Sequence, residues 1–148
     1  MPELFRDTTV LITGASRGIG AAFARLLAAR GARLLLVARH AGDLESVAAA
    51  ARQLGARADI LPCDLADPAI PARLAGQLAA RGLVVDHLIN NAGVGPQGRF
   101  ADLPVERHLP VIDGNIRAVT VLTIRLLPQM NARRRGGILN IASTEAWQ

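Results

Sequence analysis

A glycine-rich turn near the N-terminus is the first segment whose residues could bind a ligand. Gly14, Gly18 and Gly20 follow an apolar run at residues 10–12 and open an amphipathic stretch that begins near Ile19. Glycines at this spacing permit a tight turn, close approach of the backbone to a pyrophosphate, and close packing of the next helix on the strand. The free N–H groups at the start of that helix would hold the phosphates. Its place between a strand and a helix favours dinucleotide binding over a plain tight turn.

Two arginines predict that this nucleotide is NADP(H). An NAD site carries an acidic residue after the second strand, which holds the ribose 2′-hydroxyl. Arg39 occupies that position here, and the next acid is Asp43. A guanidinium holds a 2′-phosphate with paired hydrogen bonds, whereas a carboxylate would repel it. Arg17, inside the glycine turn, would be the second basic contact. The alternative is that both arginines are ordinary surface residues.

Later segments extend this pattern into a family resemblance. Residues 13–20 resemble the TGxxxGxG motif of the short-chain dehydrogenase/reductase (SDR) family, and residues 90–93 match its NNAG motif. Asn115 matches the family's active-site asparagine, and residues 137–143 match the strand that leads to its active-site serine, Ser143. The matches occur in family order and cover essentially the whole chain. The sequence is therefore identified as a member of the SDR family.

The resemblance implies which residues bind the cofactor. Asp64 would recognise the adenine amino group, Leu65 would add a backbone contact, and residues 91–93 would line the ribose side of the cleft. Asn90 would mainly tie neighbouring strands together. The full cofactor-binding set is Gly14, Ser16, Arg17, Gly18, Ile19, Gly20, Arg39, Asp64, Leu65, Asn91, Ala92 and Gly93.

The implied reaction transfers hydride between NADP(H) and a small carbonyl or alcohol substrate. Ser143 would hydrogen-bond the developing alkoxide, and Asn115 would hold a water of the proton relay. In the family, a tyrosine beyond the serine donates the proton and a nearby lysine lowers its pKa, but this chain contains neither residue type. We therefore interpret the chain as the N-terminal part of such an enzyme, inactive alone. A natural short protein that binds NADP(H) without catalysis is the alternative.

A parallel sheet is needed to bring these residues together. Apolar runs typical of buried strands occur at residues 10–12, 34–37, 60–61, 83–89 and 138–141, with helical patterns at 19–30, 44–54 and 68–81. Ile19, Phe23 and Leu26 share one face of the first helix, and Leu44 and Leu54 lie on the apolar face of the second. The alternation predicts one three-layer Rossmann-type domain, doubly wound with strand order 3-2-1-4-5. It would be an incomplete NAD(P)-binding domain spanning residues 1–148, truncated after an uncharged fifth strand.

A long apolar segment, residues 105–134, is predicted to form one helix. Pro110 is an alternative start, and Pro128 a potential kink. In the family this helix packs against its counterpart in another subunit, so a dimer or tetramer is expected at full length. The first apolar stripe is Leu109, Ile112, Ile116, Val119 and Leu126, and the second is Val111, Ala118 and Leu122.

Composition limits the other function classes. The net charge is +5 and every basic residue is arginine, which leaves a basic nucleic-acid-binding Rossmann domain as an alternative. However, the arginines at 133–135 precede glycine and fit a capped helix end, and aromatic residues, at 3%, are too few for base stacking. No apolar run could span a membrane, and Cys63, the only cysteine, has no internal disulfide partner. We expect a cytoplasmic protein without a metal site or nucleic-acid partner.

Overall fold

Five parallel strands form the central sheet, in the order β3-β2-β1-β4-β5. The computed structural model, which describes residues 4–143, confirms the predicted strand order. Because β2 and β4 pair with opposite edges of β1, the chain changes direction across the sheet between β1 and β4. In open α/β sheets, ligands bind beyond the carboxyl ends of the strands at such a switch point. The strands are β1 (Thr9–Thr13), β2 (Arg33–Ala38), β3 (Ala58–Pro62), β4 (His87–Asn90) and β5 (Gly137–Asn140).

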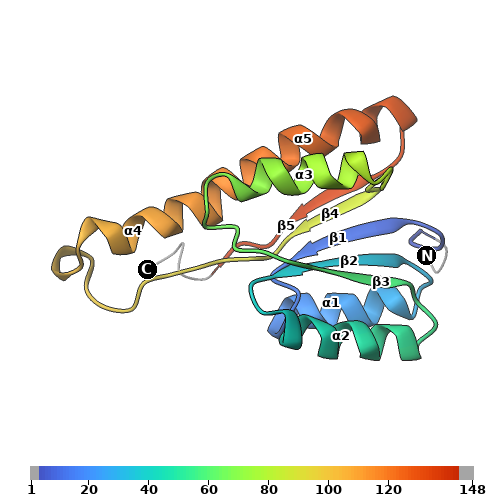
Figure 1. Ribbon diagram of the computed structural model, residues 1–148, viewed down its shortest axis with the longest axis horizontal. Coiled ribbons are helices and arrows are strands. Elements are labelled where there is room, and N and C mark those ends of the chain that lie inside the picture. The colour runs from blue at the N-terminus through green and yellow to red at the C-terminus, as the bar shows by residue number, and fades with distance from the viewer. Residues whose placement is uncertain (1–3, 144–148) are drawn as a thin grey trace.

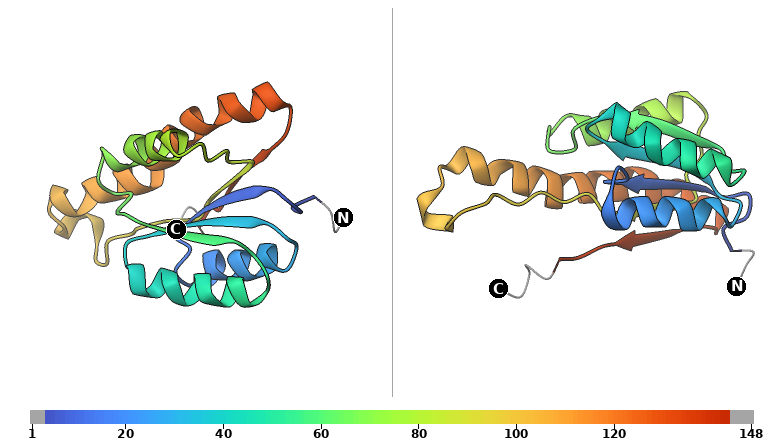
Figure 2. Two further views of the ribbon diagram at one scale, coloured as in Figure 1. Left: turned by 45° about the vertical axis from the view of Figure 1, so that its right-hand side comes forward. Right: turned by 90° about the horizontal axis from the view of Figure 1, so that it is seen from below.

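Helices cover both faces of this sheet, which confirms the predicted three-layer arrangement (Figure 1). The layer of α1 (Gly18–Ala28) and α2 (Ala41–Gln53) lies on one face. The opposite layer contains α3 (Ile70–Ala80) and α5 (Ala118–Arg133), while α4 (Val105–Ile112) extends beyond the sheet (Figure 2). A short 3-10 helix, η1 (Phe100–Asp102), precedes α4.

Strand residues alternate between the two layers. Val10 and Ile12 are fully buried in the core cluster that includes α1 and α2 residues, whereas Leu11 is fully buried in the cluster that includes α3 and α5 residues. In β2, Leu34 is likewise buried in the first of these clusters and Leu35 in the second. Burial on both faces explains why these strands are continuous apolar runs rather than alternating ones.

The buried face of α1 differs from the apolar face that the sequence suggests. Ile19 is 57% exposed and Leu26 48% exposed, while Phe23 is partly buried. The residues against the sheet are mostly small: Gly20, Ala21, Ala24, Leu27 and Ala28. Small residues allow the helix to lie close to the strands, and the side chains of Ile19 and Leu26 point outward. Leu54 is also exposed, because α2 ends at Gln53.

The predicted long helix is divided by a π-helical turn, η2 (Asp113–Arg117), between α4 and α5. The helical segment begins at Val105, so the alternative start at Pro110 is wrong, and α5 continues through Pro128. The wider turn rotates the helix face, and the first predicted stripe splits accordingly. Leu109, Ile112 and Ile116 are exposed, whereas Leu126 is buried. The residues of α5 that pack on the sheet are Ala118, Leu122, Leu126 and Met130.

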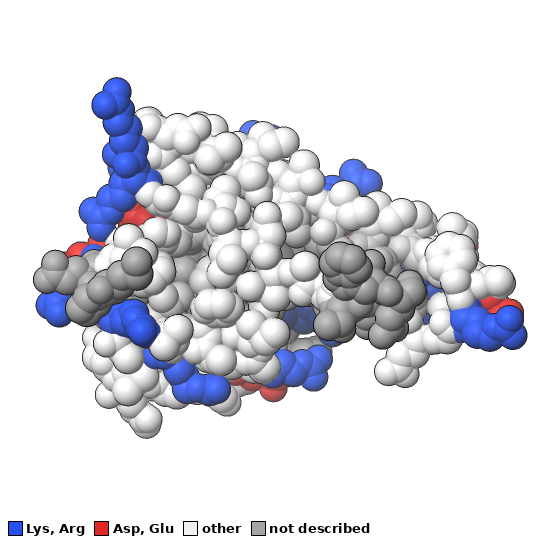
Figure 3. All heavy atoms as spheres, turned by 180° about the vertical axis from the view of Figure 1, so that it is seen from behind, with Lys and Arg blue, Asp and Glu red and all other residues white. Residues whose placement is uncertain are grey.

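The two edges of the sheet are built differently. At β3, Arg52 donates to the Ala58 carbonyl through Nε (3.1 Å) and NH2 (2.7 Å), and Pro62 has no N–H to offer. Both features hinder the addition of another strand. At β5, no residue is charged and Leu139 is 44% exposed. Figure 3 views this side of the molecule and shows a broad uncharged area with arginines near its margins. The uncharged edge agrees with the prediction for the fifth strand.

A polar cluster at the amino end of the strands gives a testable pH dependence. Asp86 accepts from the Thr9 N–H (2.9 Å) and from Arg133 (3.1 Å). Next to it, burial lowers the pKa of His87, and Arg135 lowers it further while Asp86 opposes the shift. The unfolded chain therefore binds a proton at a higher pH than the native state does. The contribution of His87 to the free energy of unfolding should be fully present above about pH 6.5. It should be lost as the pH falls through the lowered native pKa.

We expect His87→Gln to flatten this dependence, because the variant has no imidazole to protonate. Urea unfolding between pH 5.5 and 7.5 would measure the free energy of unfolding for both proteins. His108→Gln, on α4, controls for the loss of a histidine elsewhere. Equal pH slopes for the wild type and His87→Gln would contradict the prediction.

Candidate functional site

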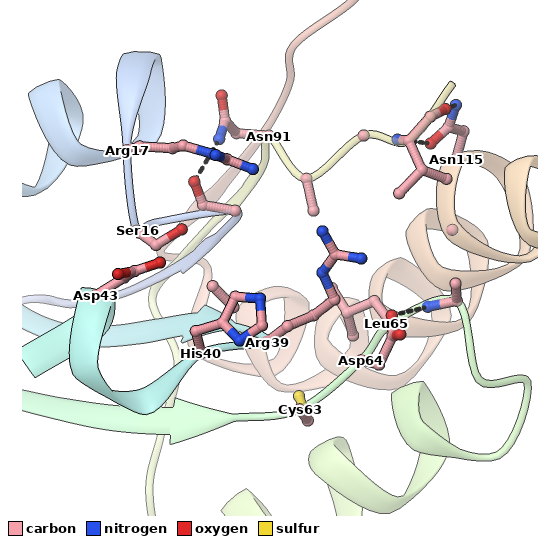
Figure 4. A pocket seen from close by; sticks show the side chains of 17 residues that line it. Ser16, Arg17, Arg39, His40, Asp43, Cys63, Asp64, Leu65, Asn91 and Asn115 are labelled. Carbon is pink, nitrogen blue, oxygen red and sulfur yellow. Dashed lines mark hydrogen bonds between the residues drawn. The ribbon is translucent and has the colours of Figure 1, made fainter. Parts of the chain in front are cut away.

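A cavity of about 190 Å³ lies beyond the carboxyl ends of β1 to β4. Its walls come from the glycine turn, the start of α2, the segments after β3 and β4, and the π-helical turn (Figure 4). Segments far apart in the sequence thus meet at one place, as the family resemblance implied. The predicted residues that line it are Gly14, Ser16, Arg17, Arg39, Asp64, Leu65, Asn91, Ala92, Gly93 and Asn115. The lining does not include Gly18, Ile19, Gly20 or Ser143.

Two glycines of the turn are required by close contacts. Gly14 has a φ of +64°, and a Cβ there would lie 2.8 Å from the Ala92 Cα. A Cβ on Gly20 would collide with the Gly14 carbonyl oxygen and would lie 2.7 Å from the Asn91 Nδ2. Gly20 is therefore the glycine that allows α1 to pack closely against the turn. At Gly18, by contrast, nothing described in the structure lies within 4 Å of an added Cβ.

We expect Gly20→Ala to lower the free energy of unfolding by about 1–3 kcal/mol, because the new methyl group has no space. Gly76→Ala is the matched control: Gly76 also lies in a helix, α3, but a Cβ there meets nothing within 4 Å. The control should be neutral or more stable by up to about 1 kcal/mol, owing to the higher helix propensity of alanine. Urea titration measures both. A Gly20→Ala protein as stable as the control would refute the close-packing role.

Thr13 and Asn91 connect the glycine turn to the segment after β4. The Asn91 side chain donates to the carbonyl oxygens of Thr13 (3.0 Å) and Gly14 (3.1 Å). The Thr13 hydroxyl accepts from the N–H groups of Asn91 (2.9 Å) and Ala92 (3.0 Å) and donates to the Ile89 carbonyl (3.3 Å). Asn91 thus lines the cavity while its amide nitrogen holds the turn in place.

Asn90, in contrast, faces the next strand. It is 4% exposed, and its Nδ2 donates to Oδ1 of Asn140 at 2.8 Å. This contact joins β4 to β5, in agreement with the strand-tying role predicted for Asn90.

Arg17 and Arg39 reach the cavity from different elements. Arg17 comes from the glycine turn and Arg39 follows β2, and Figure 4 shows both side chains extending into the space between these elements. Neither guanidinium forms a hydrogen bond or ion pair with another residue that the structure describes. Two unpaired cations beside a glycine turn make this part of the cavity suitable for an anion.

The segment after β3 supplies the opposite wall. Leu65 is buried at 8% exposure, and the Asp64 Oδ1 accepts from the Ala66 N–H at 3.0 Å. Beside them, burial raises the pKa of the Cys63 thiol to about 11, with the Asp64 carboxylate adding to the shift. The thiol is therefore protonated at neutral pH and is not a nucleophile.

Asn115 lies in the π-helical turn and binds the segment that follows β4. Its Oδ1 accepts from the Val94 N–H (2.9 Å), and its Nδ2 donates to the Val94 carbonyl (2.8 Å). π-helical turns often occur at functional sites. Here the turn presents a side-chain amide that holds the cavity wall formed by residues 93 and 94.

Ser143 is exposed and follows the end of β5 at Asn140. It lies near the end of the described residues, and residues 144–148 are outside them. Within the part of the chain that the structure describes, no cluster of His, Cys, Asp or Glu is placed to hold a metal ion. No helix there is long and apolar enough to cross a membrane.

Sequence reasoning missed three lining residues with titratable side chains, namely His40, Asp43 and Cys63. The other lining residues outside the predicted set are Ala38, Ala66, Val94 and Gly114. His40 directly follows Arg39, and Asp43 lies in the first turn of α2. For His40 and Asp43, proximity in sequence to Arg39 was the only signal available, since neither residue belongs to a motif.

Solved structures of similar fold include proteins in complex with a nicotinamide nucleotide. The chain has a TM-score of 0.88 and 38% identity to a metagenomic short-chain oxidoreductase in complex with NADP, covering 95% of this chain and 63% of that one. For a short-chain dehydrogenase from Sphingobium yanoikuyae in complex with NADPH, the TM-score is 0.87 and the identity 38%, covering 95% of this chain and 55% of that one.

Comparison with sequences gives the family. The chain is 42% identical to a fatty acyl-CoA reductase of Acinetobacter baylyi over 97% of this chain and 50% of that enzyme. It thus spans about half the length of the curated relatives that it matches. The family model described as short chain dehydrogenase matches residues 8–148. With this match, the sheet order and the glycine turn in agreement, the chain belongs to the short-chain dehydrogenase family.

Proposed function

We propose that this chain forms the NADP(H)-binding part of an oxidoreductase that interconverts a carbonyl and an alcohol by hydride transfer. The observation that carries the proposal is the pair of unpaired arginines, Arg17 and Arg39, directed into one cavity beside the glycine turn. They would hold the 2′-phosphate. The two solved relatives in complex with NADP and NADPH support this choice of nucleotide. We also propose that residues 1–148 form one incomplete NAD(P)-binding domain, as the sequence predicts.

The rest of the cavity provides places for the other parts of the nucleotide. The pyrophosphate would lie on the turn formed by residues 14–20, with the backbone N–H groups at the start of α1 directed toward it. The adenine would lie against Leu65, with its amino group near the Asp64 carboxylate. The ribose would contact residues 91–93.

For the reaction, Ser143 would donate a hydrogen bond to the oxygen of the substrate as negative charge develops on it. The Asn115 Oδ1 already accepts from Val94, but an amide oxygen has two lone pairs and can also accept from a water. These 148 residues contain no tyrosine or lysine to supply the family's proton donor. We therefore expect no NADPH oxidation by the chain alone on any carbonyl substrate.

The exposed stripe of Leu109, Ile112 and Ile116 is the surface that would pack against a second subunit in the full-length protein. An exposed apolar patch of this kind marks an interaction site, which supports the expected dimer or tetramer.

The test of the proposed nucleotide is its binding preference. NADPH should bind the chain at least tenfold more tightly than NADH, because each charge-assisted hydrogen bond contributes about 1.5–3 kcal/mol. Titration calorimetry at constant ionic strength measures both dissociation constants. Equal affinities would overturn the proposal. A labelled DNA duplex that binds the chain and is not displaced by NADPH would instead favour a nucleic-acid-binding domain.

A further inference from the structure

The N-cap and the first turn of α2 place two titratable side chains, those of His40 and Asp43, at the cavity. His40 is the N-cap residue of α2, but its side chain makes no capping hydrogen bond, and Asp43 follows in the first turn. Neither side chain forms a hydrogen bond or ion pair with another described residue. Both line the cavity together with Arg39. Figure 4 shows the side chains of His40, Arg39 and Asp43 around the same cavity.

We propose that His40 is a third cationic contact of the 2′-phosphate, beside Arg17 and Arg39, and that its protonation makes the preference for NADPH over NADH depend on pH. The inference rests on the proposed function. Histidine is the side chain that ordinarily changes its charge between pH 5 and 8. A protonated imidazole donates a charge-assisted hydrogen bond to phosphate, whereas the neutral ring donates only a weaker one.

The charged groups around His40 determine how strongly its protonation is linked to binding. Arg17, from the glycine turn, and Arg39, after β2, are positive charges that oppose a further positive charge in the cavity. Asp43, on α2, favours it, while the Asp64 carboxylate, after β3, already accepts a hydrogen bond from Ala66.

A bound 2′-phosphate would reverse the balance, because it adds negative charge between the arginines and the ring. By linkage, phosphate binding then favours proton uptake, and protonation favours phosphate binding by the same factor. NADH has no 2′-phosphate, so its binding should not be linked to this proton.

The experiment compares the wild type, His40→Gln and His40→Arg by titration calorimetry with NADPH and NADH at pH 6.5 and 8.5. In the wild type, the ratio of the NADH to the NADPH dissociation constant should be roughly five- to tenfold larger at pH 6.5 than at pH 8.5. His40→Gln should have a small ratio at both values of pH. His40→Arg, with a permanent charge, should have a large ratio at both. The phosphate's own titration is common to all three proteins.

The outcomes separate this inference from the proposed function. If NADPH is preferred but the ratio changes with pH equally in the wild type and His40→Gln, or does not change in the wild type, His40 is not the linked group and the inference is wrong. If none of the three proteins prefers NADPH at either pH, the proposed function itself fails. Circular dichroism would check that the variants are folded, which is expected because His40 is exposed and its side chain makes no capping hydrogen bond to α2.

Discussion

Ser143→Ala is expected to lower turnover by roughly 10²–10³ in the active enzyme, which is the cost of removing one hydrogen-bond donor to a developing oxyanion. The active form for this test is a chimera of the chain with the C-terminal half of the A. baylyi fatty acyl-CoA reductase, of which it matches about half. Steady-state rates of NADPH oxidation on a carbonyl substrate give kcat and KM. The loss should fall on kcat, because the hydrogen bond strengthens as charge develops in the transition state.

Two control variants distinguish this role from a structural one. Ser143→Thr retains a hydroxyl and should preserve a larger share of the turnover than alanine does. Ser16→Ala removes a hydroxyl from the nucleotide cavity and should change the KM for NADPH more than kcat. If the kcat of the Ser143→Ala chimera were within a few fold of that of the unmodified chimera, Ser143 would have no role in the reaction.

Arg39→Asp is expected to reduce the preference for NADPH by roughly ten- to hundredfold and thereby narrow or reverse it. The change removes a charge-assisted hydrogen bond, worth about 1.5–3 kcal/mol, and places a carboxylate where it repels the 2′-phosphate. The same carboxylate can accept from the 2′-hydroxyl of NADH. Calorimetry with both nucleotides measures the two affinities separately.

Arg57→Asp is the matched control for net charge. Arg57 is exposed and directly precedes β3, at the opposite end of the strand from the cavity, so the variant alters the total charge equally. It should leave the ratio of the two dissociation constants unchanged at constant ionic strength. An Arg39→Asp protein with the wild-type ratio would show that Arg39 does not contact the phosphate.

The fold was predicted well where short-range patterns decide it. The strand order follows from the alternation of strands and helices together with right-handed crossovers, and the apolar runs lie in the sheet as expected. The helix faces were predicted less well. Ile19 and Leu26 are exposed because α1 approaches the sheet through glycine and alanine, which contribute little to an apolar pattern. The π-helical turn was also missed, since the residues in it carry no sequence signal that distinguishes it from an α-helix.

The candidate site divides in a similar way. Gly14, Arg17 and Arg39 are predictable because a glycine turn and the position after a strand are local features. His40 was missed because nothing in its sequence context shows that its side chain faces the cavity rather than capping α2. The role of Asn115 was predicted as a water contact. The structure instead shows its amide bonded to the backbone of Val94, and the water contact remains a prediction.

The sequence by itself determined the family, the parallel sheet and the glycine turn beside two arginines, because each depends on residues that are close together in the chain. Only the tertiary structure decided which side chains share the cavity and which ones hold its walls. The contact of Asn91 with Thr13 joins residues 78 positions apart, and that of Asn115 with Val94 spans 21. Such contacts depend on how closely the strands and helices pack, and this distance is set by small residues such as Gly20 whose effect appears only when the elements meet.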